Sequence, residues 1–100
     1  MYERQHLNLE AELVQTRDLR KSGFAHKDRK AYWYFSGATR GLQWARDAQA
    51  QDVECRIEAA ATALITSYTP ATWPGKSRPE MVTAFLRGYI AGIERVFKKV

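Results

Sequence analysis

A chain of 100 residues has room for one small domain, residues 1–100, and a hydrophobic content of 45% excludes a disordered tail. Sixteen basic and eleven acidic side chains give a formal net charge of +5. This charge favours anionic partners without selecting among nucleic acid, an acidic protein and a membrane surface.

The cysteine count and the apolar runs indicate where the protein works. Cys55 is the single cysteine, which excludes a disulfide within the chain and a cysteine zinc site and fits a reducing compartment. Acidic residues in MYERQHLNLEAEL interrupt any signal-peptide pattern. The longest apolar run, 59–65, is far shorter than the roughly 20 residues of a membrane span. We therefore expect a cytoplasmic protein with no membrane partner.

The first predicted helix begins after Asn8, which is a suitable N-cap. Leu9, Leu13 and Thr16 recur at helical spacing, and charged residues mostly occupy the other faces. Gly23 follows a basic pair and Ser22, and glycine at that place is a typical C-terminal stop. The pattern predicts a short helix that ends at Gly23.

Residues 28–67 contain no proline and are rich in Ala, Leu, Gln and Arg, a composition that favours helix. The aromatic residues at 32–35 would suit a strand, but no second strand follows to pair with them. The segment therefore forms one long helix or two, with a break at Gly37, at Gly41 or in the polar stretch 49–52. An apolar stripe in its second half comprises Val53, Ile57, Ala60, Leu64 and Ile65.

Two pairs of glycines are spaced by four residues, Gly37 with Gly41 and Gly88 with Gly92. Glycine inside a helix costs about 1 kcal/mol relative to alanine, so each pair needs a packing reason. Close approach of two helices is that reason. The surface of the second pair contacts either the middle helix or a partner protein.

The last helix is predicted over 78–99, because Ser77 and Glu80 match a capping box and Pro79 suits the first turn. Lys98 and Lys99 suit the negative end of its dipole. The predicted fold is all-α, with three or four helices and a long middle helical segment packed against an amphipathic C-terminal helix. The apolar face of that last helix comprises Val82, Phe85, Leu86, Tyr89, Ile90, Ile93, Val96 and Phe97.

No arrangement of residues along the chain is typical of an enzyme. His6 and His26 are far apart, each without a carboxylate at relay or ligand spacing, and Cys55 lies in a charged helical stretch. The segment 37–41 lacks the Lys-Ser ending of a phosphate-binding loop. We expect no catalytic site, no metal site and no cofactor.

The stretch KAYWYFSGATRGLQWAR combines aromatic and basic residues, as surfaces that stack bases and hold phosphates do. On a helix its four consecutive aromatic residues point to all sides, so we expect Phe35 and Trp44 in the core and leave Trp33 open. The basic residues before it are either a solvated helix start or a contact for an anionic partner, and their charge is unfavourable at a helix N-terminus. These basic residues are Lys27, Arg29 and Lys30.

The stretch YTPATWPGKSRPE, residues 68–80, contains all three prolines of the chain. Trp73 and Pro74, followed by Lys76 and Arg78, have the composition of a binding hot spot, an aromatic anchor with basic flanks. Trp73 either serves this role or caps the core. Pro74 and the earlier Pro70 each permit a cis peptide bond, which makes a host prolyl isomerase a candidate partner.

In size, charge and the YTPATWPGKSRPE loop before an amphipathic helix, the chain resembles the small anti-RecBCD proteins of lambdoid phages. The resemblance implies binding to the RecC subunit, modulation of the RecBCD nuclease, protection of phage DNA ends, and phage recombination in the host cytoplasm. Two alternatives remain: a basic accessory protein that binds nucleic acid non-specifically, and an inhibitor of another defence complex such as a CRISPR effector. The expected partner-binding residues are Trp73, Pro74, Lys76, Arg78, Lys27, Arg29 and Lys30.

Overall fold

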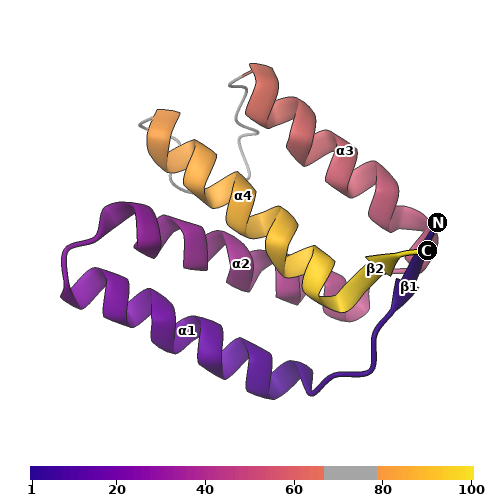
Figure 1. Cartoon of the computed structure of the whole chain (residues 1–100), viewed down its shortest axis with the longest axis horizontal. Helices are drawn as coiled ribbons and strands as arrows, with labels where there is room; N and C mark the ends of the chain where they lie inside the picture. The colour runs from indigo at the N-terminus through magenta and orange to yellow at the C-terminus, as the bar shows by residue number, and fades with distance from the viewer. Residues whose placement is uncertain (67–78) are drawn as a thin grey trace.

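Helices dominate the part of the chain that the structure describes, residues 1–66 and 79–100 of a computed structural model (Figure 1). In chain order the elements are β1 (Tyr2–Arg4), α1 (Leu9–Ala25), α2 (Arg29–Asp47), α3 (Ala50–Thr66), α4 (Pro79–Val96) and β2 (Phe97–Lys99). The two strands form one small antiparallel sheet. The predicted all-α fold is confirmed, with four helices in the described residues.

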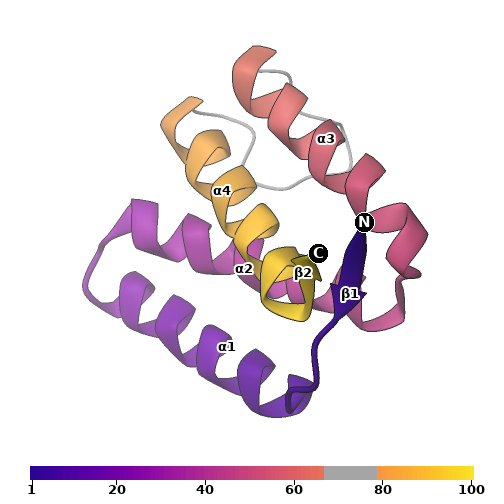
Figure 2. The ribbon, with the colours of Figure 1, turned by 45° about the vertical axis from the view of Figure 1, so that its right-hand side comes forward.

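The helices lie across the molecule in the order α1, α2, α4, α3, as the views in Figures 1 and 2 show. α1 and α2 are antiparallel neighbours joined by a short turn. α2 and α4 run in the same direction, because α3 returns the chain to the side where α2 begins before α4 starts. α2 and α4 also share the most extensive contact between any two elements. The predicted packing of the middle segment on the C-terminal helix is therefore between α2 and α4.

Glycines from both helices meet at the α2–α4 contact. Gly37 and Gly41 of α2 face the backbone of Phe85 and Tyr89 on α4. In return, Gly88 and Gly92 lie against backbone carbonyls of α2, those of Tyr34 and Ala38. A Cβ atom at any of the four would overlap a main-chain oxygen of the other helix. The second glycine pair thus contacts the middle segment, which decides between the two predicted alternatives.

The middle segment forms two helices, which separate at Ala48 and Gln49, so only the first residue of the predicted polar break 49–52 lies outside a helix. Asp28 caps α2, since its side chain accepts a hydrogen bond of 3.1 Å from the backbone N–H of Ala31. At the other end Ala48 has extended backbone, and α3 begins at Ala50. Gly37 and Gly41 do not break α2; they lie buried within it.

The prediction that α1 ends at Gly23 is wrong, because the helix continues to Ala25. The backbone N–H of Lys27 donates to the carbonyl of Phe24 at 3.1 Å, and that of Asp28 to Gly23 at 2.8 Å. These two bonds form a Schellman motif, in which Lys27 takes the left-handed position with φ of 56°. Gly23 instead lies where α1 approaches the backbone of α2 closely. The predicted N-cap Asn8 is confirmed by its 3.1 Å bond from the Ala11 N–H.

The predicted end of the last helix is also wrong, because α4 stops at Val96 and residues 97–99 form β2. β2 pairs with β1, placing Glu3 opposite Lys98 and Arg4 opposite Phe97. Phe97 is buried, so its apolar character serves the core from a strand rather than from a helix. Glu80 lies in the first turn of α4, while Ser77 of the predicted capping box is outside the described residues.

Arg4 connects this small sheet to the end of α2. Its Nη2 atom donates to the carbonyls of Ala45 at 3.0 Å and Ala48 at 2.8 Å, at the C-terminus of the helix, where carbonyls lack their usual intrahelical partners. Its guanidinium also lies 4.7 Å from the ring centroid of Phe97. The two ends of the chain are therefore held against the C-terminal end of α2.

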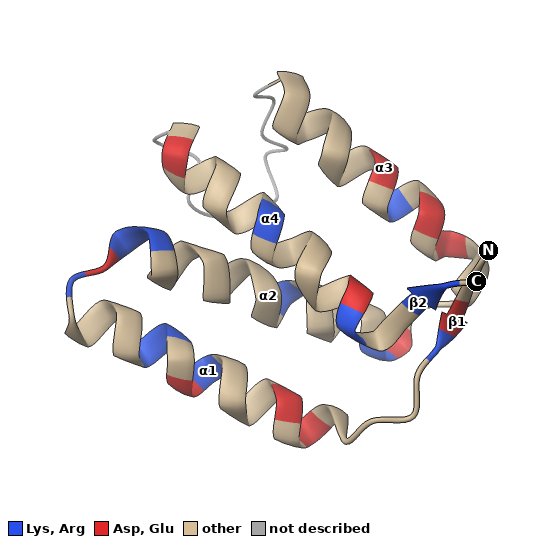
Figure 3. Cartoon of the chain, in the orientation of Figure 1, with Lys and Arg blue, Asp and Glu red and all other residues tan. Residues whose placement is uncertain are grey.

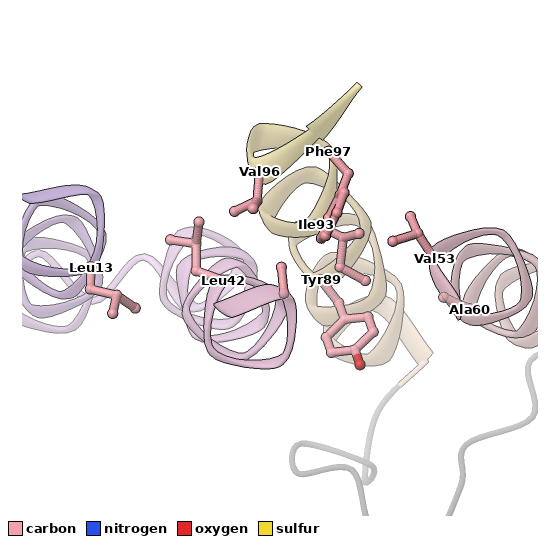
Figure 4. Close-up of a cluster of buried hydrophobic side chains, with 9 residues drawn as sticks. Leu13, Leu42, Val53, Ala60, Tyr89, Ile93, Val96 and Phe97 are labelled. Carbon is pink, nitrogen blue, oxygen red and sulfur yellow. The ribbon is translucent and has the colours of Figure 1, made fainter. Parts of the chain in front are cut away.

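Side chains from all four helices and β2 form the main core, shown in Figure 4. Trp44 packs against this cluster as predicted, while Phe35 is only half-buried and its ring contacts that of Tyr34. Ile65, predicted in the apolar stripe of α3, is 85% exposed, so the stripe ends before it. The buried members of the main cluster are Leu13, Leu42, Ala45, Val53, Ala60, Tyr89, Ile93, Val96 and Phe97.

We predict that Gly88→Ala destabilises the protein by at least about 2 kcal/mol, because the added methyl group overlaps the Tyr34 carbonyl and separates α2 from α4. At an unconstrained helix position the same change would stabilise by about 1 kcal/mol. Urea denaturation measures the difference. Ala59→Gly, at an exposed site on α3, is the control and should cost only about 1 kcal/mol. A Gly88→Ala protein as stable as the wild type would contradict the close contact.

Candidate functional site

The residues predicted to bind a partner fall into two groups. Trp73, Pro74, Lys76 and Arg78 lie outside the described residues. The other three belong to the turn between α1 and α2 and the start of α2, and all are exposed: Lys27, Arg29 and Lys30. In Figure 3 this end of the molecule is mostly blue, with one red segment between the two helices.

A hollow opens beside this turn, and we call it the turn hollow. Its volume is about 720 Å³, and Lys27 and Arg29 line it together with Phe24 of α1 and Met81 of α4. Phe24 is 73% exposed although it is a large apolar residue. The turn hollow therefore places an exposed aromatic side chain among cations. Its remaining lining residues are Gly23, Ala25, Asp28, Tyr32 and Trp33.

The aromatic rings form a continuous series from this surface into the core. The ring centroids of Phe24 and Tyr32 are 5.9 Å apart, and those of Tyr32 and Trp33 are 5.2 Å apart in an edge-to-face arrangement. Trp33 in turn lies 6.5 Å from the ring of buried Phe85. Tilted and edge-to-face ring pairs at these distances are favourable. The exposed ring of Phe24 is therefore connected to the core through Tyr32 and Trp33.

Tyr32 and Trp33 also line a second concavity, which we call the arginine groove. Its volume is about 470 Å³, and it takes Arg17 and Arg20 from α1 and Arg40 from α2. The two concavities share only Tyr32 and Trp33. The other residues that line the groove are Ser36, Thr39, Gln43 and Phe85.

Carboxylates do not neutralise these cations in the part of the chain that the structure describes. The ion pairs of this part of the chain are Arg95 with Glu12 at 2.9 Å and Arg46 with Asp47 at 3.5 Å, and none of these residues lines either concavity. Asp28 lines the turn hollow, but its carboxylate already accepts the N-cap hydrogen bond of α2. The arginine groove has no acidic lining residue.

Tyr89 is a buried residue whose phenol lies near two cations. Burial raises the pKa of its phenol above the ordinary 10.0, and the nearby cations Arg56 and Arg40 act in the opposite direction. Its ring stacks on Phe85 at 6.4 Å between centroids. The phenol is therefore held neutral over a wider pH range than in the unfolded chain.

His26 follows the last residue of α1 and contacts Ser22 of that helix. Its ring Nδ1 lies 2.8 Å from the backbone carbonyl of Ser22 and 3.4 Å from the Ser22 hydroxyl oxygen, and both residues are exposed. His6 and Cys55 are exposed as well. Within residues 1–66 and 79–100 no group of three or more His, Cys, Asp and Glu side chains could hold a metal ion.

Sequence reasoning missed Phe24 and the three arginines of the groove. The prediction that the helix ends at Gly23 places Phe24 in a loop and gives it no role. Arg17 and Arg20 are three apart on one helix face, which was a visible signal. Arg40 could be joined to them only through the packing of α1 on α2.

No protein-family model, curated protein or solved structure matches the chain. Among the described residues, no helix combines the length and apolar character that crossing a membrane requires. The chemistry of the two concavities is therefore the basis for any statement about function.

We predict that the stability of the protein falls as the pH rises above about 10, and that Tyr89→Phe reduces this loss. The folded state holds the phenolic proton more tightly than the unfolded state. Its contribution is complete below the unfolded pKa and disappears as the pH passes the folded pKa. Urea denaturation of both proteins at a series of pH values from about 8 to about 11 measures it. Parallel curves for the two proteins would show that Tyr89 does not carry the effect.

Proposed function

We propose that the protein is a non-enzymatic binding protein that modulates a host DNA-processing or defence complex. The specific target we propose is RecBCD, bound through its RecC subunit, with protection of phage DNA ends as the outcome. The contact surface in this proposal is the turn hollow together with the predicted loop residues Trp73, Pro74, Lys76 and Arg78.

The observation that supports a protein contact is the exposed ring of Phe24 inside a hollow. Large exposed apolar side chains in a concavity with a polar rim are typical of binding sites, where an aromatic residue serves as the anchor. Lys27 and Arg29 at the rim favour a partner with acidic residues around an apolar side chain.

The backbone of Lys27 adds a second argument. Glycine is the usual residue at the left-handed position of a Schellman motif, because a side chain there is strained by about 1 kcal/mol. A lysine at this position makes the protein less stable than a glycine would, and it adds a cation to the lining of the turn hollow. Backbone strain of this kind is concentrated at functional sites.

The predicted loop belongs to the same proposal. The described chain resumes at Pro79, two residues before Met81, which lines the turn hollow. Trp73, Pro74, Lys76 and Arg78 would add an aromatic anchor and two more cations to the contact. A host prolyl isomerase that acts on Pro70 or Pro74 remains a proposed additional partner.

We predict that Lys27→Gly separates stability from binding. Glycine relieves the left-handed strain, so the unfolding free energy should be unchanged or higher by about 0.5–1 kcal/mol. Loss of the cation should reduce the amount of partner captured. Urea denaturation and quantitative pull-down measure the two effects on the same preparation. A stabilised variant that captures its partner as well as the wild type would exclude a role for this lysine.

We predict that the tagged protein recovers RecBCD subunits from a nuclease-treated bacterial lysate, as identified by mass spectrometry. Phe24→Ala should reduce recovery at least about fivefold, because anchor residues contribute about 1–2 kcal/mol or more. Trp73→Ala and Lys76→Glu test the loop in the same way. The control is Ile65→Ala, which removes another exposed apolar side chain, at the end of α3. Recovery without any RecBCD subunit would exclude RecBCD as the target. Equal losses for Phe24→Ala and Ile65→Ala would exclude the turn hollow as the contact surface.

A further inference from the structure

We infer that the arginine groove is a binding site for single-stranded nucleic acid, in which the guanidinium groups hold phosphates and a base stacks at Trp33. This inference goes beyond the proposed function, because it concerns a different surface and a different class of ligand. It rests on the lining of the groove and on the charge of its residues.

Arginines from two helices surround the groove. Arg17 and Arg20 are three residues apart and lie on the same face of α1, and Arg40 of α2 also lines the groove. A guanidinium presents a planar fork of N–H donors that matches the oxygens of a phosphate. Three such groups around one groove provide several contacts for the phosphates of a strand.

The cations of the groove are available to a ligand. In the described parts of the chain, no carboxylate forms an ion pair with Arg17, Arg20 or Arg40. Arg40 acts on the Tyr89 phenol, which burial keeps neutral, so its positive charge is not balanced there. The absence of an acidic lining residue leaves the field of the groove positive.

Polar residues of α2 also line the groove. The hydroxyls of Ser36 and Thr39 donate to carbonyls of their own helix, at 2.7 and 2.8 Å. Their protons are therefore used, and acceptor lone pairs are what these two hydroxyls retain for the amino group of a base. Gln43 adds a side-chain amide that both donates and accepts.

The aromatic wall favours a single strand over other anionic ligands. Tyr32 and Trp33 are half-buried and contact each other edge to face, so this favourable ring pair is present without a ligand. Stacking on such rings is open to the unpaired bases of a single strand, whereas a duplex keeps its bases paired and offers mainly phosphates. An acidic protein would use the cations but would leave the ring wall without a stacked base.

Fluorescence anisotropy with a labelled oligothymidine of about 16 nucleotides tests the inference on the full-length protein. We expect binding that weakens with salt, with a slope of about −2 in a plot of log affinity against log salt, from three phosphate contacts. The matching duplex should bind more weakly at the same salt concentration. Equal or tighter binding of the duplex, or no binding of the single strand, would overturn the inference.

Matched variants separate the groove from general charge. Arg20→Gln should weaken binding about fivefold or more and make the salt slope shallower by about 0.7. Arg87→Gln removes the same charge from an exposed position on α4 outside the groove and should have a much smaller effect. Equal weakening by the two variants would overturn the inference in favour of non-specific attraction.

Two further measurements test the base contact and the ligand class. Trp33→Phe, which keeps an aromatic ring against Phe85, should weaken single-strand binding, and circular dichroism with urea denaturation confirms that it is folded. Polyglutamate should compete poorly; competition as strong as that of the single strand would assign the groove to acidic proteins. Because Arg20→Gln leaves Phe24 intact, it should still capture the protein partner, so the two proposals fail or succeed separately.

Discussion

The close parallel contact between α2 and α4 determines where the large side chains of this protein lie. The carbonyls of Tyr34 and Ala38 lie directly against glycines of α4, so no side chain fits between the two backbones. The four aromatic residues at 32–35 are therefore displaced to the flanks of α2, and all four are only half-buried. Tyr32 and Trp33 line both the turn hollow and the arginine groove. The close packing of α2 on α4 thus influences the lining of both concavities.

Patterns that act within one helix were sufficient to predict much of the fold. The glycine pairs, the N-cap Asn8 and the apolar face of α4 are local signals, and the structure has each of them in the expected role. Gly23 shows the limit of such reasoning, because a glycine before a turn and a glycine at a close helix contact look alike in sequence. The Schellman motif with Lys27 at its left-handed position carries no comparable signal, since lysine rarely occupies it.

Features that join distant parts of the chain could not be predicted. The strands β1 and β2 are three residues each, too short to show an alternating pattern, and they pair the two ends of the sequence. The role of Arg4 could not be predicted either. Its hydrogen bonds to the carbonyls of Ala45 and Ala48 form only when the sheet places Arg4 at the end of α2. For the candidate site, the basic residues of the turn were visible in sequence. That Arg40 lines the same groove as Arg17 and Arg20 depends on how α2 packs on α1, which the sequence does not show.

The two proposed contacts place different demands on the same pair of rings. The turn hollow and the arginine groove share Tyr32 and Trp33 but no cation, so a protein and a nucleic acid strand would contact the same two rings and different charged residues. Trp33 contacts Phe85, and Phe85 belongs to the helix that the glycines hold against α2. Both proposals therefore depend on the same contact between α2 and α4, because it holds together the helices whose rings line the two concavities.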